Sequence, residues 1–191
     1  MQDNSNLRAK IDIRRQIIEE LKSALSIDRI NVLEFCTGEE RKIYHALYEI
    51  ENTISLDRKP IPGALRFEAL KYIKQKGLDG INYFDIDTYG TPYIIALNVM
   101  KNAKPGTYGM ALTDGAFSTS STGSAQGKEK ILRLAINNRR GIPIPGLIRF
   151  RRYIAMKTLQ LVAKTSKVTI TQCKYCYIPR MSYIGIIFKK S

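Results

Sequence analysis

The chain has 191 residues, of which 44% are hydrophobic and 25% are charged. This composition excludes intrinsic disorder and a fibrous repeat as the main description, and the length predicts one domain over 1–191. The longest apolar stretches, Tyr93 to Leu97 and Tyr183 to Phe188, are far shorter than the roughly 20 residues of a membrane span. The first residues contain no apolar run before a cleavage site, so we expect a cytoplasmic protein with no membrane insertion.

The charge balance is strongly basic. The 31 Lys and Arg residues exceed the 17 Asp and Glu residues and give a formal net charge of +14 at pH 7. Such an excess favours polyanionic partners, with nucleic acid first and anionic membrane surfaces second, whereas charge that serves only solubility is the alternative. We expect a nucleic-acid partner, RNA in the first place. The candidate contacts, each equally consistent with a solvated face, are Arg139, Arg140, Arg149, Arg151 and Arg152, with Lys128 and Lys130 in a loop.

The three cysteines are too few and too unevenly placed for a disulfide framework. Cys173 and Cys176 have the spacing of a metal hook, but structural zinc takes four ligands and the single histidine, His45, lies far away in the sequence. We therefore expect no metal site, and we interpret the pair as small buried thiols in a strand.

Predicted helices and strands alternate along the first part of the chain. Apolar residues at helical spacing predict helices over 7–25 (in an amino-terminal segment 1–28), 39–50, 65–76 and 91–103, the last with Pro92 in its first turn. Short apolar or β-branched runs predict strands over 30–36, 52–57, 81–87 and 107–113. This alternation is typical of an α/β fold with a mainly parallel sheet and right-handed crossovers.

The rest of the chain begins with a segment that is rich in Ser, Thr and Gly, over 115–130, which predicts a mobile loop. Helical patterns follow over 127–139 and 146–164. Two β-rich runs, 167–176 and 182–189, predict an antiparallel hairpin within 167–191.

Informative residues follow three of the predicted strands: Glu34 to Gly38, Asp57, and Asp85 to Pro92. In an open parallel sheet, ligands bind beyond the carboxyl ends of the strands. Gly38 allows close approach of a ligand, and an acid at the end of the next strand is well placed to accept hydrogen bonds from both ribose hydroxyls. Neither a P-loop nor a dinucleotide fingerprint occurs. The pattern predicts a nucleoside-binding site.

The segments INVLEFCTG, TISLDRKP, NYFDIDTYGTPY and TYGMALTDG, with the closing hairpin, resemble the class I S-adenosylmethionine-dependent methyltransferases. More narrowly, DIDTYGTPY resembles the D-x-D-P-[FY]-G-[ST]-P segment of the tRNA (guanine N2) dimethyltransferases, and RKIYHALYEI and PRMSYIGIIF are similar to that family too. The resemblance covers roughly 30–189. It implies a Rossmann-like sheet, mostly parallel with a carboxyl-terminal antiparallel hairpin. Because only ten residues separate Asp57 from Glu68, either the usual helix there is missing or an edge strand is trimmed.

The resemblance also implies site residues and S-adenosyl-L-methionine as the cofactor. It assigns cofactor binding to Glu34, Cys36, Gly38, Asp57 (to the ribose), Glu68 (to the adenine amine, a poor match) and Asp85. It assigns catalysis to Asp87 and Tyr89.

The chemistry of an amine acceptor supports Asp87 independently. The lone pair of an exocyclic amine is delocalised into the ring, so an enzyme must accept its hydrogen bonds and take a proton during methyl transfer. A carboxylate supplies that acceptor, and Tyr89 is suited to stack on an extruded base. Asp85, two residues earlier on the same face of the strand, competes for the catalytic role. The alternative for 87–90 is an ordinary strand-to-helix turn with a capping residue.

Three features depart from the family pattern. Glu39 and Glu40 follow Gly38, where they suit a helix amino terminus but also crowd a cofactor carboxylate. Thr88 replaces a proline, and the relatives carry a further carboxyl-terminal domain. We expect a methyltransferase that acts on the exocyclic amine of a nucleobase, with guanine in RNA as the first candidate. Two alternatives stay open: a catalytically inactive nucleic-acid-binding module, and a methyltransferase that acts on DNA, a protein or a small molecule. A homodimer, or a partner that supplies a substrate-recognition domain, fits the short chain.

Overall fold

The computed structural model describes residues 7–38, 47, 52–88, 91–115, 151–178 and 181–191. Its strands are β1 (Val32–Phe35), β2 (Thr53–Asp57), β3 (Leu65–Arg66), β4 (Tyr83–Asp87), β5 (Gly106–Asp114), β6 (Val168–Ile178) and β7 (Met181–Lys190). Its helices are α1 (Leu7–Leu25), α3 (Ala69–Lys76), α4 (Tyr93–Asn102) and α7 (Arg151–Ser166). The predicted helices over 39–50 and 127–139, and nearly all of the predicted loop over 115–130, lie outside these residues.

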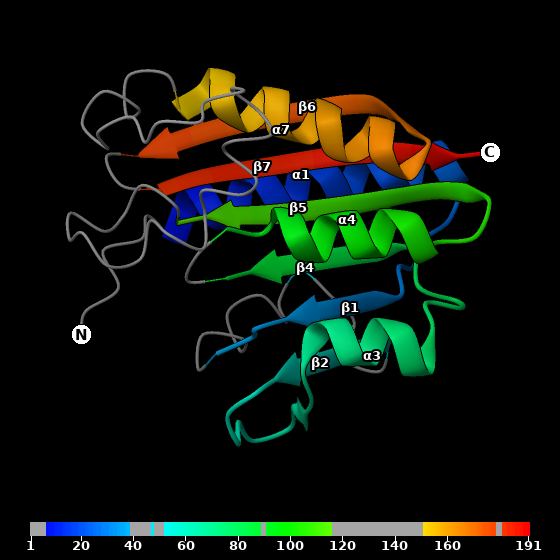
Figure 1. The fold of residues 1–191 in the computed structure, drawn as a ribbon, viewed down its shortest axis with the longest axis vertical. Helices are drawn as coiled ribbons and strands as arrows, with labels where there is room; N and C mark the ends of the chain where they lie inside the picture. Colours follow the sequence, from blue (N-terminus) through cyan, green and yellow to red (C-terminus); the bar gives the residue numbers. More distant parts are fainter. Residues whose placement is uncertain (1–6, 39–46, 48–51, 89–90, 116–150, 179–180) are drawn as a thin grey trace.

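The strands form one seven-stranded sheet with the order β3-β2-β1-β4-β5-β7-β6 (Figure 1). Strands β3, β2, β1, β4 and β5 run parallel to one another. Strand β7 is antiparallel to both β5 and β6. This topology confirms the predicted α/β sheet, which is mostly parallel and ends in an antiparallel hairpin.

One edge of the sheet differs from the prediction of a helix over 65–76. Leu65 pairs with Leu56 in a two-residue strand, and α3 begins only at Ala69. The amide of Phe67 donates to the carbonyl oxygen of Asp57 at 2.9 Å, which extends this pairing by one step. The apolar spacing of Leu65 and Phe67 therefore belongs to a short edge strand. Both alternatives that the Asp57–Glu68 spacing left open are confirmed: no helix lies between β2 and β3 over 58–64, and the edge strand is only two residues long.

The interpretation of Cys173 and Cys176 as buried thiols is wrong. Cys173 is exposed and Cys176 is half-buried, and both are free thiols. They lie on β6, the last strand of the sheet, and no second sheet or further strand covers that edge in the part of the chain that the structure describes.

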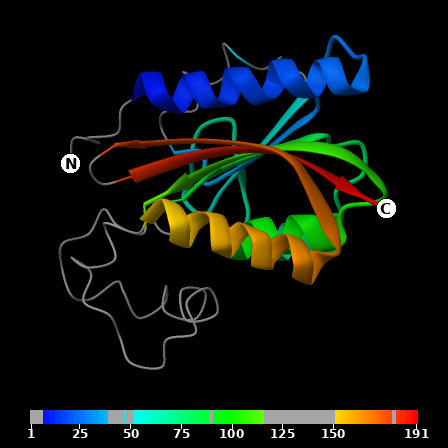
Figure 2. The same cartoon turned by 90° about the horizontal axis from the view of Figure 1, so that it is seen from above.

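Helices cover both faces of the sheet (Figure 2). Helix α1 packs on one face, against β5 and β7, and α4 and α7 pack on the other. The close approach of α1 depends on two glycines: a Cβ atom at Gly185 would overlap the side chain of Ile17, and one at Gly109 would lie 3.0 Å from Leu21 Cδ2. None of the described helices is long and apolar enough to cross a membrane.

Candidate functional site

The candidate site lies at the edge of the sheet where the parallel strands end (the arrowheads at the left of Figure 1). Phe35 pairs with Leu56 and with Ile86, and Asp87 pairs with Thr113. The register therefore brings the ends of β1, β2, β4 and β5 side by side, as the sequence predicted for the strands that precede Gly38, Asp57 and Asp87.

The loop after β1 turns sharply through two residues with positive φ. Cys36 has a φ of 61° and Gly38 a φ of 56°. Cys36 is a rare non-glycine residue in this region, which glycine adopts without cost. A Cβ atom built at Gly38 would meet no atom of the described residues within 4 Å. Within that part of the chain, the loop thus turns its backbone at Gly38 toward open space.

Asp57, at the end of β2, holds this loop in place. Its Oδ2 accepts a hydrogen bond from the amide of Gly38 at 3.1 Å, and its Oδ1 accepts one from the amide of Lys59 at 2.8 Å. A carboxylate has about four acceptor positions. Each oxygen of Asp57 therefore retains one acceptor position. Together the two positions can take two further donors, which is the number that a ribose diol presents.

The two aspartates at the end of β4 differ in their surroundings. Asp85 is 2% exposed, and its carboxylate binds Arg14 of α1 through two hydrogen bonds, from Nε to Oδ2 at 2.5 Å and from Nη2 to Oδ1 at 2.7 Å. The Asp87 side chain is 18% exposed, and its Oδ2 lies 3.3 Å from Lys10 Nζ and 3.8 Å from Arg14 Nη2. Asp85 thus forms a buried ion pair, whereas part of the Asp87 carboxylate is exposed at the end of the strand.

Negative charge from two strands converges on Cys36. Burial, and after it the nearby carboxylates of Asp57 and Asp87, raise the pKa of its thiol to about 11, against a smaller lowering by Arg58. A thiol at this position stays protonated at neutral pH. The same field favours a positively charged group beside the loop.

Three buried threonine hydroxyls at this edge have no hydrogen-bond partner within the described residues. They belong to Thr37, which follows β1, Thr88, which follows β4, and Thr113 near the end of β5. Buried hydroxyl groups are normally hydrogen-bonded in native proteins. Three exceptions on neighbouring strands point to a polar ligand or ordered water at this edge.

Two further residues predicted for cofactor binding are engaged by protein groups. Glu34 is 2% exposed, and its Oε2 accepts a hydrogen bond from the hydroxyl of Ser55 at 2.6 Å. Glu68 precedes α3 and pairs with Arg58 at 3.4 Å and with Lys71 at 3.8 Å. Glu34 therefore braces β1 against β2, and Glu68 lies beside the end of β2, with its side chain partly exposed.

The remaining predicted site residues either lie outside the described residues or lie elsewhere in the fold. Tyr89, Arg139, Arg140 and Arg149 lie outside the described residues, as do Glu39 and Glu40. Arg151 and Arg152 begin α7 and contact tyrosines of β6. Within the described ranges, no group of three or more His, Cys, Asp or Glu side chains is arranged to hold a metal ion.

Sequence analysis missed Lys10 and Arg14, the basic partners of the two aspartates. Both are buried, at 2% and 1% exposure. The signal was present in α1: Lys10 and Arg14 lie one turn apart, in line with the apolar residues Ile17 and Leu21. A basic pair on the core-facing side of a helix needs buried carboxylates, because an unpaired buried charge is very costly.

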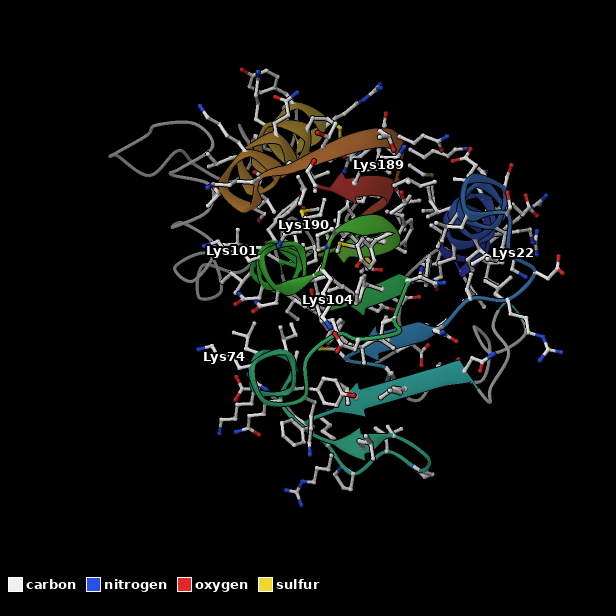
Figure 3. The ribbon with its side chains drawn as sticks, turned by 90° about the vertical axis from the view of Figure 1, so that its right-hand side faces the viewer. Lys22, Lys74, Lys101, Lys104, Lys189 and Lys190 are labelled. Atoms are coloured by element: carbon white, nitrogen blue, oxygen red, sulfur yellow. The ribbon has the colours of Figure 1, made fainter. Side chains whose placement is uncertain are left out.

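A depression of about 150 Å³ lies at the opposite edge of the sheet, lined by Leu78, Asp79, Gly80, Lys104 and Tyr108. Figure 3 shows this edge with its lysines labelled. Lys104 pairs with Asp79 at 2.8 Å, and Lys190 donates to the carbonyl oxygens of Met100 and Lys101 at the end of α4. These lysines stabilise the local structure, and the depression is remote from the strand ends that carry the candidate site.

Comparisons with known proteins support the fold. A scan of protein-family models and a search of curated proteins found no match. Among solved structures, Trm1 from Pyrococcus horikoshii, solved with S-adenosyl-L-methionine, is similar over 98% of this chain with a TM-score of 0.59 and 16% identity. A Lactococcus lactis protein described as a hemolysin is similar over 93% of this chain and 86% of its own, with a TM-score of 0.54 and 9% identity.

At such identities the likeness concerns the fold. The chain spans 56% of the length of the Pyrococcus protein. The fold is Rossmann-like and of the class I methyltransferase type, as the sequence resemblance implied.

Proposed function

We propose that the protein is an S-adenosylmethionine-dependent methyltransferase that methylates the exocyclic amine of a nucleobase, guanine in RNA. The observation that carries the proposal is that Asp57 and Asp87 lie at the same edge of the sheet. Asp57 holds the Gly38 loop and can still accept further hydrogen bonds, and Asp87 is a partly exposed carboxylate at the end of β4. The resemblance of DIDTYGTPY to the tRNA (guanine N2) dimethyltransferases supports the amine acceptor and RNA as the substrate class.

The residues present fit the cofactor. Asp57 offers two free acceptor positions for the ribose hydroxyls, and the open space at Gly38 admits a ligand beside the loop. The unpartnered hydroxyls of Thr37 and Thr88 add polar contacts. When bound, the cofactor supplies an electrophilic methyl group on a cationic sulfur, and the negative field at Cys36 favours that charge. The Pyrococcus horikoshii protein, solved with the same compound, supports this assignment.

Asp87 acts as the acceptor for the amine protons. Its carboxylate accepts hydrogen bonds from the amine, which places the nitrogen lone pair toward the methyl donor, and then takes the proton that the amine releases. Lys10 and Arg14 fix the carboxylate in one orientation. Arg14 also donates to both oxygens of Asp85. We therefore assign Asp85 the role of positioning α1 on β4, in preference to the role of contacting the cofactor directly.

The remaining assignments follow the sequence resemblance. Glu34 and Cys36 shape the cofactor loop, Glu68 lies where an adenine-binding acid is expected, and Tyr89 stacks on the substrate base. The arginines Arg139, Arg140, Arg149, Arg151 and Arg152 contact the nucleic acid. A second copy of the chain, or a partner that supplies a substrate-recognition domain, completes the recognition of the RNA.

The engagement of both aspartates by Lys10 and Arg14 favours a second candidate, a catalytically inactive module that binds nucleic acid. Calorimetric titration with S-adenosylmethionine and S-adenosylhomocysteine separates the two. Saturable binding, followed by transfer of labelled methyl groups to an RNA pool and not to DNA or protein pools, supports the enzyme. Absence of cofactor binding by the folded protein contradicts it and leaves the inactive module.

A further inference from the structure

The positive charge of the chain is concentrated in its last third. Residues 1–129 contain 17 basic and 17 acidic side chains, whereas residues 130–191 contain 14 basic side chains and no acidic one. The whole excess of +14 therefore arises after residue 129. Helix α7 and the hairpin β6–β7 belong to this segment, and residues 151–191 hold nine of its basic side chains. A charge asymmetry of this kind is the electrostatic footprint of a polyanion-binding face.

The outer face of α7 combines these charges with an exposed aromatic ring. Tyr153, Lys157, Gln160 and Lys164 recur at helical spacing and are all exposed, while the opposite side of the helix is buried against the sheet. Tyr153 is 57% exposed, and Lys157 Nζ lies 5.7 Å from the centre of its ring. An exposed tyrosine beside a lysine offers a stacking surface next to a phosphate-binding group.

The end of β6 presents a second aromatic group beside the first turn of α7. Tyr177 is 58% exposed, and the guanidinium carbon of Arg151 lies 4.1 Å from its ring centre. Arg151 Nη1 also donates to the carbonyl oxygen of Ile178 at 3.1 Å, which fixes the guanidinium in place. The ring centres of Tyr175 and Tyr177 lie 6.3 Å apart, and the guanidinium carbon of Arg152 lies 5.8 Å from the ring centre of Tyr175. Tyr177 is thus held by its neighbours while much of its surface faces solvent.

The sheet register places this aromatic group at the same edge as the candidate site. Asp114 pairs with Ser182, and Ser182 pairs with Tyr177, one step beyond the row that contains Asp87 and Thr113. Three strand spacings separate β4 from β6 in the sheet order, so the backbones at Tyr177 and Asp87 lie roughly 14 Å apart along the edge. The Asp87 side chain faces α1 and the Tyr177 side chain faces α7, so a strand that reaches both passes over this edge of the sheet. A few nucleotides span that distance.

We propose that the α7–β6 face, defined as Arg151, Arg152, Tyr153, Lys157, Lys164 and Tyr177, binds single-stranded nucleic acid and leads it toward Asp87. Phosphates lie on the basic side chains, and bases stack on Tyr153 and Tyr177, as is common for strands that are bound without base pairing. The proposal shares the substrate class of the proposed function, but the binding that it describes requires neither the cofactor nor methyl transfer.

The test is fluorescence anisotropy with labelled 12-nucleotide oligo(U) and oligo(dT), recorded at several salt concentrations without cofactor. The variants are Tyr153→Ala and Tyr177→Ala, each matched by the Phe variant, which keeps the stacking ring. The charge variant is Lys157→Gln/Lys164→Gln. Its matched control is Lys74→Gln/Lys76→Gln, an equal charge change on exposed lysines of α3, which α4 separates from α7 (Figure 1).

We expect each Ala variant to raise Kd by about 5- to 100-fold and each Phe variant to leave it nearly unchanged. The Lys157/Lys164 variant is expected to reduce the slope of log Kd against log salt by about 1.4, and the control pair to leave it unchanged. Stronger binding of oligo(U) than of oligo(dT) assigns the site to RNA, and equal binding assigns it to single-stranded RNA and DNA alike. The proposal is overturned if the Ala and Phe variants bind alike, if both lysine pairs act alike, or if only anionic phosphatidylserine vesicles bind the face.

Such a failure is distinguishable from failure of the proposed function. Calorimetric binding of S-adenosylmethionine by the same Tyr and Lys variants reports on the cofactor site, which is formed by other residues. Loss of oligonucleotide binding with intact cofactor binding supports the α7–β6 face, and an intact face without cofactor binding contradicts only the enzyme.

Discussion

Arg14 and Asp85, 71 residues apart in the chain, form a buried ion pair with two hydrogen bonds of 2.5 and 2.7 Å. Arg14 is carried by α1, and Asp85 lies two residues before Asp87 on β4. Because the second nitrogen of the same guanidinium also lies 3.8 Å from Asp87, one side chain orients both aspartates. The amino-terminal helix is therefore part of the candidate site as well as of the fold.

The ion pair makes a first prediction about stability. Arg14→Met leaves the Asp85 carboxylate buried without its guanidinium, so we expect the free energy of unfolding in urea to fall by about 3 to 5 kcal/mol. The double variant Arg14→Met/Asp85→Leu removes both charges and should recover most of that loss. Arg15→Met, on the exposed side of the same helix, is the control and should change stability by less than about 0.5 kcal/mol. Equal effects of the Arg14 and Arg15 variants would show that the pair contributes nothing.

A second prediction concerns the cofactor. Asp57→Ala removes the acceptor for the ribose hydroxyls and for the amide of Gly38, so we expect calorimetric affinity for S-adenosylmethionine to fall by roughly 1 to 3 kcal/mol. Asp79→Ala removes an exposed carboxylate at the opposite edge of the sheet and serves as the control. If folded Asp57→Ala binds the cofactor as well as the control does, Asp57 is not in the site.

The raised pKa of Cys36 makes a third prediction. A pKa of about 11, caused by burial and then by Asp57 and Asp87, keeps the thiol protonated near neutral pH. Iodoacetamide reacts with the thiolate, so alkylation of Cys36, followed by mass spectrometry, should be slow at pH 8 and still increase between pH 9 and 10. Asp57→Asn removes one of the charges that raise the pKa, so it should speed the reaction at pH 9. A rate that is constant above pH 8 would contradict the assigned field.

A fourth prediction concerns the packing of α1 on the sheet. Gly185→Ala introduces a methyl group where Ile17 already lies, and overpacking of this kind costs about 1 to 3 kcal/mol. Ile17→Ala makes room for that group at the cost of a cavity. Chemical denaturation should therefore show that the double variant loses less stability than the two single variants added together. Strict additivity would mean that the two residues do not meet.

Most of the sheet follows from local patterns in the sequence. The apolar runs that precede Gly38, Asp57 and Asp87 predict β1, β2 and β4 because buried parallel strands are continuous apolar segments. The amphipathic pattern of 7–25 predicts α1 with its observed bounds. These features are set by residues that are close in the chain.

The features that the sequence did not reveal depend on contacts between distant residues. The two-residue strand β3 exists only because Leu65 pairs with β2, so its own residues carry no strand pattern. The roles of Lys10 and Arg14 require that side chains of α1 reach the end of β4, which only the strand order and the packing of the helix decide. The exposure of Cys173 follows from the position of β6 at the edge of the sheet.

The most direct test of the proposed function is transfer of labelled methyl groups from S-adenosylmethionine to RNA by the wild-type protein and by Asp87→Ala, with the modified nucleosides identified by mass spectrometry. We expect the wild type to produce guanosine methylated at its exocyclic amine, and Asp87→Ala to bind the cofactor normally while transferring methyl groups about 10² to 10⁴ times more slowly. Asp79→Ala should transfer at the wild-type rate. Full transfer by Asp87→Ala would pass the role to another group, and the absence of a methylated amine in RNA with bound cofactor would contradict the proposal.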